Sequence, residues 1–195
     1  MRPRVTVIIV MAAVLAAVSV SCSLRLAVVP ASDVPSQIVE SLPKWTPDGA
    51  SEVAWRAVYE QDGYVFAAVT YTMGGTLFAD PRNVLWIGIP ASGGTDVVYP
   101  FINYPWERSR YSWKTGHFQT PTGMYQFYAC GYASDKAAAK VVGTTNAGRT
   151  FEANLTNGFW TLLVPEHFGG EGFEQVALQN QQGETIWTYR LADEA

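Results

Sequence analysis

The sequence is poor in the residues that build disulfide frameworks, metal sites and nucleic-acid-binding surfaces. It has only two cysteines, Cys22 and Cys130, which excludes a framework of several disulfides. It has two histidines and no short spacing of His, Cys and carboxylates of the kind that holds a metal. The net charge of −4, with no run of lysine or arginine, argues against nucleic acid as a partner. We therefore expect no metal, no other cofactor and no nucleic-acid ligand.

Sequence signatures of catalysis are also missing. The chain has no Gly-x-Ser-x-Gly elbow, and its glycine pairs lack the spacing of phosphate-binding or dinucleotide-binding loops. His117 would serve as a general base only if Asp96, Asp135 or Ser112 lay beside it in the fold. Glu166, His167 and Glu171 could meet in one loop to hold a metal, but we expect a solvated acidic turn there. The sequence therefore favours a non-enzymatic protein and assigns no catalytic residue.

One long hydrophobic segment stands out against this background. Residues 5–24 carry no charge, Arg2 and Arg4 precede them, and Arg25 follows. An α-helix needs about 20 predominantly apolar residues to cross a bilayer, which this segment supplies. The excess of positive charge before the segment places the N-terminus in the cytoplasm. We expect a single-pass protein of the cell membrane whose C-terminal body lies outside the cytoplasm.

Two other interpretations of the same segment stay open. It is a cleaved secretory signal if the small residues of Val29-Pro30-Ala31 form the cleavage site, and the body is then secreted. It is a lipoprotein signal if lipid is attached at Cys22, where Ser21 suits lipidation but Ser19 replaces the usual aliphatic residue. In every case Cys130 is the one cysteine of the body. This is more typical of a bacterial surface protein than of a secreted eukaryotic domain, which more often contains disulfides.

The chain after residue 25 divides into two parts. Residues 26–50 contain Pro30, Pro35, Pro43 and Pro47, which indicates a linker that would hold the body tens of ångströms from the membrane. A short helix over residues 35–42 stays open within it, since Ile38, Val39 and Leu42 could share a face. Residues 51–195 form the body. A sub-boundary near 133–140 would apply if the body consisted of two small sandwiches.

The spacing of apolar runs and turns in the body is typical of an all-β protein. Strands are predicted by alternating or continuous apolar runs, with β-branched and aromatic residues, between turns that nearly always contain glycine. Residues 84–89 (VLWIGI) predict a strand buried on both faces, and Cys130 is expected in the core. The last third predicts strands at residues 140–145, 149–155, 159–164, 173–178 and 185–189.

This spacing resembles that of the immunoglobulin-like β-sandwich modules carried by many bacterial surface proteins. The resemblance covers about 60 residues and lies in the spacing of strands and turns, without a signature motif. It implies an antiparallel β-sandwich, one or two in number, and carries no activity over to this chain.

Residues 105–118 (PWERSRYSWKTGHF) are the most distinctive part of the body. Basic and aromatic side chains alternate here within an acidic chain, and we call them the basic–aromatic strip: Trp106, Arg108, Arg110, Tyr111, Trp113, Lys114 and His117. Aromatic faces stack on sugar rings, and arginine forks bind carboxylates or phosphates. The strip therefore predicts a binding surface for an anionic glycan, an envelope polymer or a lipid headgroup. A hairpin with cross-strand aromatic and cationic pairs would give the same pattern.

The functional prediction follows from these features together. We expect a membrane-anchored β module that binds a partner protein or an anionic polymer or glycan of the envelope through the basic–aromatic strip, without catalysis. One alternative is a hydrolase of cell wall or glycan that uses His117 and a carboxylate. Another is an accessory subunit of a membrane protein complex.

Overall fold

The structure, a computed structural model, describes residues 27–73, 82–92, 101–102, 111–119, 125–164 and 171–190. Within these ranges no helix has the length and apolar character needed to cross a membrane. Residues 5–24, for which the sequence predicts a membrane helix, lie outside the described residues. The anchor therefore stays a prediction.

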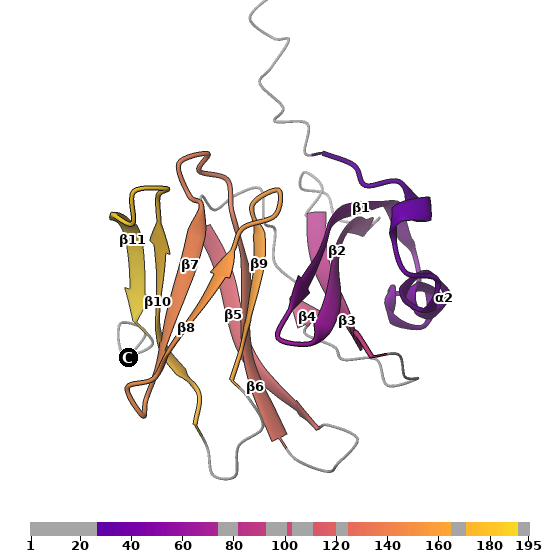
Figure 1. Ribbon diagram of the computed structural model, residues 1–195. Helices are drawn as coiled ribbons and strands as arrows, with labels where there is room; N and C mark the ends of the chain where they lie inside the picture. The colour runs from indigo at the N-terminus through magenta and orange to yellow at the C-terminus, as the bar shows by residue number, and fades with distance from the viewer. Residues whose placement is uncertain are drawn as a thin grey trace, which may run out of the picture.

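The described chain consists mostly of antiparallel β-strands, as the sequence predicts (Figure 1). The elements are a 3-10 turn η1 (Ala31–Asp33), the helix α2 (Ser36–Trp45) and the strands β1 (Ala50–Gln61), β2 (Tyr64–Met73), β3 (Arg82–Pro90), β4 (Phe101–Ile102), β5 (Tyr111–Gln119), β6 (Tyr125–Ala133), β7 (Lys140–Thr145), β8 (Thr150–Asn154), β9 (Phe159–Leu163), β10 (Phe173–Gln179) and β11 (Thr185–Arg190). The five strands predicted in the last third correspond to β7–β11.

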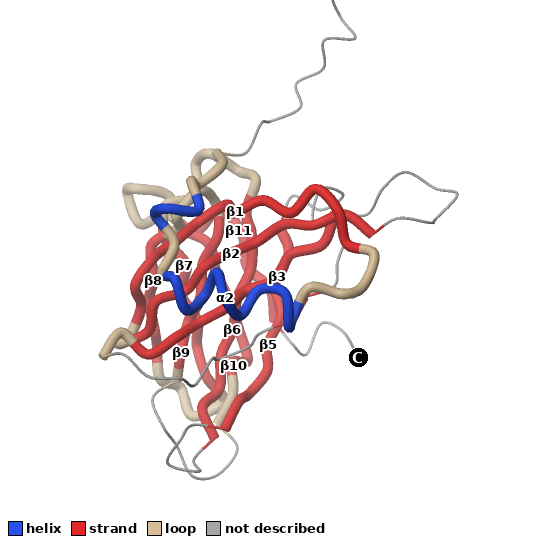
Figure 2. Tube along the Cα trace, turned by 90° about the vertical axis from the view of Figure 1, so that its right-hand side faces the viewer, coloured by secondary structure: helices blue, strands red, loops and turns tan. Residues whose placement is uncertain are grey.

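The strands form three sheets stacked as layers. The first sheet has the strand order β1-β2-β3-β4, the middle sheet β5-β6-β9, and the third sheet β11-β10-β7-β8. Figure 1 shows the middle sheet between the other two, and Figure 2 shows α2 crossing the outer face of the first sheet. The hydroxyls of Tyr59 on β1 and Thr161 on β9 share a hydrogen bond of 2.7 Å between the first and middle sheets.

Strands β6 and β9 of the middle sheet are buried on both faces, and successive side chains of each strand enter different cores. On β9, Phe159 and Leu163 pack with Trp86 in the core between the first and middle sheets. Trp160 and Leu162 pack in the core between the middle and third sheets. On β3, as predicted, neighbouring residues also enter different cores, and Trp86 and Ile87 are both fully buried.

Part of the predicted linker packs on the body. Residues 36–45 form α2, and Ile38 is fully buried among side chains of the first sheet. Ile38 and Leu42 lie one turn apart and share the apolar face of the helix. Pro35 is compatible with the helix because it lies at the N-cap, where no backbone N–H is needed, and its carbonyl accepts from the amides of Ile38 and Val39. Pro43 lies inside the helix, in its last turn. This segment is therefore the short helix that the sequence allows, and it packs on the body.

Residues 134–139 connect the middle sheet to the third sheet, at the place proposed for a sub-boundary. The chain then returns, because β9 pairs with β6 in the register Tyr128↔Leu163 to Tyr132↔Phe159. A cut at 133–140 would separate these two hydrogen-bonded strands. Residues 111–190 are thus interleaved across that point.

Cys130 is fully buried between the first and middle sheets, as predicted. Burial raises the pKa of its thiol, and the charge of Lys114 offsets only part of this rise. We expect the thiol of folded Cys22→Ser protein to resist a disulfide reagent at pH 8.5 and to react fully after denaturation. Because the folded state favours the neutral thiol, stability should fall as the pH rises above the ordinary value of 9.0. Rapid labelling of the native protein would contradict this burial.

Candidate functional site

The basic–aromatic strip lies partly on β5, one of the two edge strands of the middle sheet. Trp106, Arg108 and Arg110 lie outside the described residues. The other four members are on β5, where the alternation of the strand divides them.

The two faces of β5 carry different chemistry. Tyr111 and Trp113 face the third sheet, and His117 shares their face. Lys114 lies on the opposite face with Phe118, whose ring is 6.0 Å from that of Tyr64 in the first sheet. The structure thus places the three aromatic members of the described strip on one face of β5 and Lys114 on the other.

Tyr111 and Trp113 each pair with a ring on β11, the edge strand of the third sheet. The ring centroids of Tyr111 and Trp187 are 5.0 Å apart, and those of Trp113 and Tyr189 are 4.9 Å apart. All four side chains are half-buried. The Tyr111 hydroxyl donates a hydrogen bond of 2.9 Å to Asp135, which fixes the ring at this end of β5. The four rings close the edge between the middle and third sheets.

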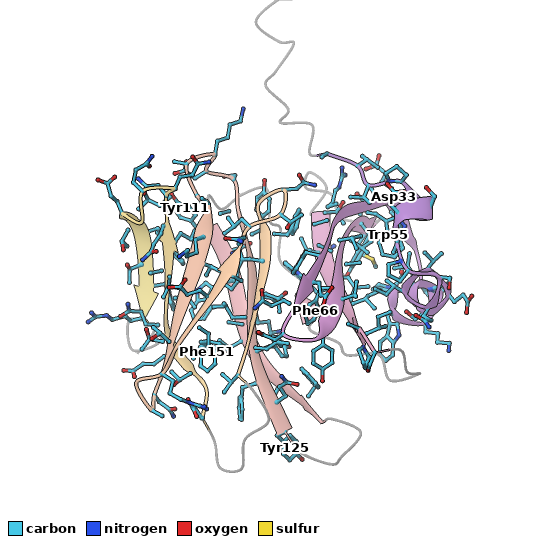
Figure 3. The ribbon with its side chains drawn as sticks, viewed as in Figure 1. Asp33, Trp55, Phe66, Tyr111, Tyr125 and Phe151 are labelled. Atoms are coloured by element: carbon cyan, nitrogen blue, oxygen red, sulfur yellow. The ribbon has the colours of Figure 1, made fainter. Side chains whose placement is uncertain are left out.

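The same face of β5 continues to His117 at the other end of the strand. Its ring lies 5.3 Å from that of Tyr125 and 5.6 Å from that of Phe127, both on β6. Tyr125 is 51% exposed. Figure 3 shows Tyr111 and Tyr125 at opposite ends of the middle sheet. We call the half-buried and exposed rings of this edge the aromatic row: Tyr111, Trp113, His117, Tyr125, Trp187 and Tyr189.

Sequence analysis does not find Tyr125, Trp187 or Tyr189 as site residues. Trp187 and Tyr189 are two residues apart, which is the spacing of one strand face. The local sequence does not show that β11 packs against the edge strand β5 of another sheet. A strand tryptophan is also expected in the core. Trp187 does contact the core between the middle and third sheets, yet it stays half-buried because its strand is at the edge.

The structure does not bring His117 to two of its three proposed partners. His117 pairs with Phe127 on β6, whereas Asp135 follows the opposite end of that strand and accepts from Tyr111. Ser112 lies on the other face of β5. Asp96 lies outside the described residues. Within the described ranges, no group of three or more His, Cys, Asp and Glu is placed to hold a metal.

Glu171 is buried, and the expectation of a solvated acidic turn is wrong. It is 4% exposed and accepts a hydrogen bond of 2.6 Å from the Thr145 hydroxyl and one of 2.7 Å from Arg149 Nε. Arg149 Nη2 donates to its second oxygen. The Glu171 carboxylate raises the pKa of the Arg149 guanidinium. This ion pair joins the β7–β8 turn to the segment before β10, and we assign it a structural role.

Comparisons with known proteins return no relative of this chain. No family model matches it, and neither a curated protein nor a solved structure matches it. The case for function therefore comes from the chemistry of the surfaces described above.

Proposed function

We propose that this chain is a membrane-anchored, extracytoplasmic β module of a bacterial surface that binds an anionic glycan or polymer of the envelope without catalysis. The observation that carries the proposal is the aromatic row at the edge shared by the middle and third sheets. Arg110 directly precedes Tyr111 of the row, and Arg108 and Trp106 are close to it in sequence. The row thus places rings where the basic part of the strip joins β5.

The chemistry of the row suits a sugar polymer with acidic groups. Half-buried rings offer apolar surface on which sugar rings can stack. Arginine forks bind carboxylate or phosphate in a bidentate manner. Since β5 and β11 are edge strands of rigid sheets, the rings are held in place before a ligand arrives, which lowers the entropic cost of binding.

We further propose that β5–β11 form an immunoglobulin-like sandwich. These seven strands divide into sheets of three and four. In chain order, the first, second and fifth lie in one sheet, and the third, sixth and seventh lie in the other, as in immunoglobulin-like modules. The fourth strand, β8, pairs with β7 rather than with β9. The first sheet and α2 would then be an addition on one face of this sandwich.

The packed N-terminal segment implies a short tether between the proposed anchor and the body. The backbone N–H of Val29 donates a hydrogen bond of 2.9 Å to the carbonyl of Trp55 on β1. If residues 5–24 span the bilayer, residues 25–28 are the whole connection to Val29, and four residues extend about 14 Å at most. The body would therefore stay beside the membrane, closer than a 25-residue linker would allow.

Binding of polygalacturonate, an anionic polysaccharide, by the full chain in a non-ionic detergent tests the proposal. We expect Arg108→Gln combined with Arg110→Gln to weaken binding at least tenfold, because charge-assisted hydrogen bonds contribute about 1.5–3 kcal/mol each. Tyr125→Ser should weaken it about threefold through loss of an exposed ring. Lys114→Gln is the matched control, because it removes one charge from the other face of β5, and it should leave binding unchanged.

These outcomes distinguish binding at the aromatic row from nonspecific attraction between charges. Equal losses from Lys114→Gln and from the arginine variants would contradict a defined surface. Equal binding of polygalacturonate and neutral dextran would contradict the choice of an anionic ligand. No binding of either polymer by the folded wild-type chain would remove the proposal.

A further inference from the structure

A cleft that contains two charged side chains opens along β1 at the end of the body where the N-terminal segment enters. Trp55 and Asp33 lie at this end, near the top of Figure 3. The cleft has a volume of about 380 Å³ and is lined by Glu52, Val53, Ala54, Arg56, Thr70, Tyr71 and Thr72. None of these residues belongs to the aromatic row or to the Glu171 ion pair.

Irregular pairing of β1 with β2 builds this cleft. The register shifts between Ser51 and Ala54 and again between Trp55 and Ala57. Glu52, in the first shift, has a φ of 49°, which is uncommon for a residue other than glycine, asparagine or aspartate. Bulges of this kind re-aim side chains and occur often beside binding sites. Strain of this kind persists where the surrounding structure holds it, and it often marks a ligand site.

Two buried threonine hydroxyls hold the charged groups of the cleft in place. Arg56 Nε donates a hydrogen bond of 2.7 Å to Thr70 Oγ1. Thr72 Oγ1 donates one of 3.1 Å to Glu52 Oε2. Thr70 and Thr72 are 1% and 6% exposed, so both hydroxyls are fixed by their surroundings. Residues two apart on one strand face are separated by about 7 Å, which sets the spacing of the cation and the anion.

We propose that this cleft binds a small zwitterion, with a primary ammonium group at Glu52 and a phosphate or carboxylate at Arg56. A ligand with both charges is complementary to a fixed pair of opposite charges, whereas a simple anion or cation is repelled at one end. A sugar ring or a base would need an aromatic face for stacking. Tyr71, the aromatic residue of the cleft lining, is 2% exposed and packs in the core beneath α2.

This chemistry has two sources, a phosphoethanolamine lipid headgroup and a free amino acid. The headgroup fits the position of the cleft, because a short tether would hold this end of the body beside the bilayer. Val28 and Val53 are 64% and 42% exposed, and Val53 is part of the cleft lining. The choice of the headgroup rests on the proposed anchor, whereas the choice of a zwitterion rests on the cleft alone.

The test is calorimetric titration of glycerophosphoethanolamine into the full chain in a maltoside detergent. Glu52→Gln and Arg56→Gln should each weaken binding at least tenfold, and Thr72→Val about threefold, because it frees the carboxylate while keeping the shape of the side chain. Glu60→Gln is the matched control for Glu52, since both are exposed carboxylates of β1. Arg190→Gln is the control for Arg56. Both controls should bind as the wild type does, and circular dichroism checks that each variant is folded.

Three further probes decide the chemistry and the source. Glycerophosphocholine should bind at least tenfold more weakly, because its quaternary ammonium cannot donate a hydrogen bond to Glu52. Stronger binding of glycerophosphoethanolamine than of glycine supports the lipid source, and the reverse supports the amino acid. Equal binding of glycerophosphoethanolamine and glycerophosphate would overturn the proposal, as would equal losses in the Glu52 and Glu60 variants. These results leave polygalacturonate binding, and thus the proposed function, to its own test.

Discussion

Replacing either Phe159 or Trp160 by alanine is expected to lower the free energy of unfolding by about 3–5 kcal/mol. The two residues are neighbours on β9 and point to opposite faces of the middle sheet, yet both are buried. Phe159 lies 5.9 Å from Trp86 of the first sheet, measured between ring centroids. Trp160 packs toward the third sheet, against the space left by Gly131 on β6. In a two-layer sandwich one face of the strand would be exposed, so only one of the two substitutions would lower the free energy of unfolding by this much.

Urea unfolding of the full chain in a non-ionic detergent measures this difference. Thr188→Ala on β11 is the control, because Thr188 is exposed on an edge strand and should change the free energy by less than about 0.5 kcal/mol. A loss below about 1 kcal/mol at either Phe159 or Trp160 would show that one face of the middle sheet is open to solvent.

The second large effect is expected at the buried ion pair. Arg149→Ala should lower the free energy of unfolding more than any other change at this pair, because it leaves the buried Glu171 carboxylate without its charged donor. Glu171→Gln should cost less, about 2 kcal/mol. The amide keeps the size of the carboxylate and an acceptor for Thr145, and the Arg149 side chain is 46% exposed and can be hydrated.

The control for this pair is a second ion pair that joins β7 and β8. Lys140 Nζ lies 2.8 Å from Glu152 Oε2, and both side chains are exposed. Glu152→Gln should therefore change the free energy of unfolding by less than about 1 kcal/mol. A similar small effect for Arg149→Ala would mean that Glu171 reaches water, and the structural role assigned to it would fail.

The strands of the body could be predicted because their limits are local. Glycine and asparagine mark the turns, as at Asp62-Gly63 and Asn157-Gly158, where all four residues have positive φ. The helix α2 could be predicted only as an alternative over residues 35–42, since the prolines of residues 26–50 indicate a linker. The helix is stabilised by packing of its apolar face on the first sheet, which covers Ile38.

The layer order and half of the candidate site could not be predicted, because both depend on long-range pairing. Period-two alternation places Tyr111 and Trp113 on one face of a strand, but it does not tell which sheet covers that face. The contact of β5 with β11 joins residues that are more than 70 positions apart. The burial of Glu171 depends likewise on Arg149 and Thr145, from a turn 22 residues away or more.

Amide hydrogen exchange of the full chain measures the central claim, that the middle sheet lies inside the body, most directly. The amides shared by β6 and β9 lie between two cores and should exchange only through global unfolding, more slowly than those of the edge strands β1 and β11. Exchange of β6 and β9 amides as fast as those of β11, under conditions where the protein stays folded, would contradict the three-layer arrangement.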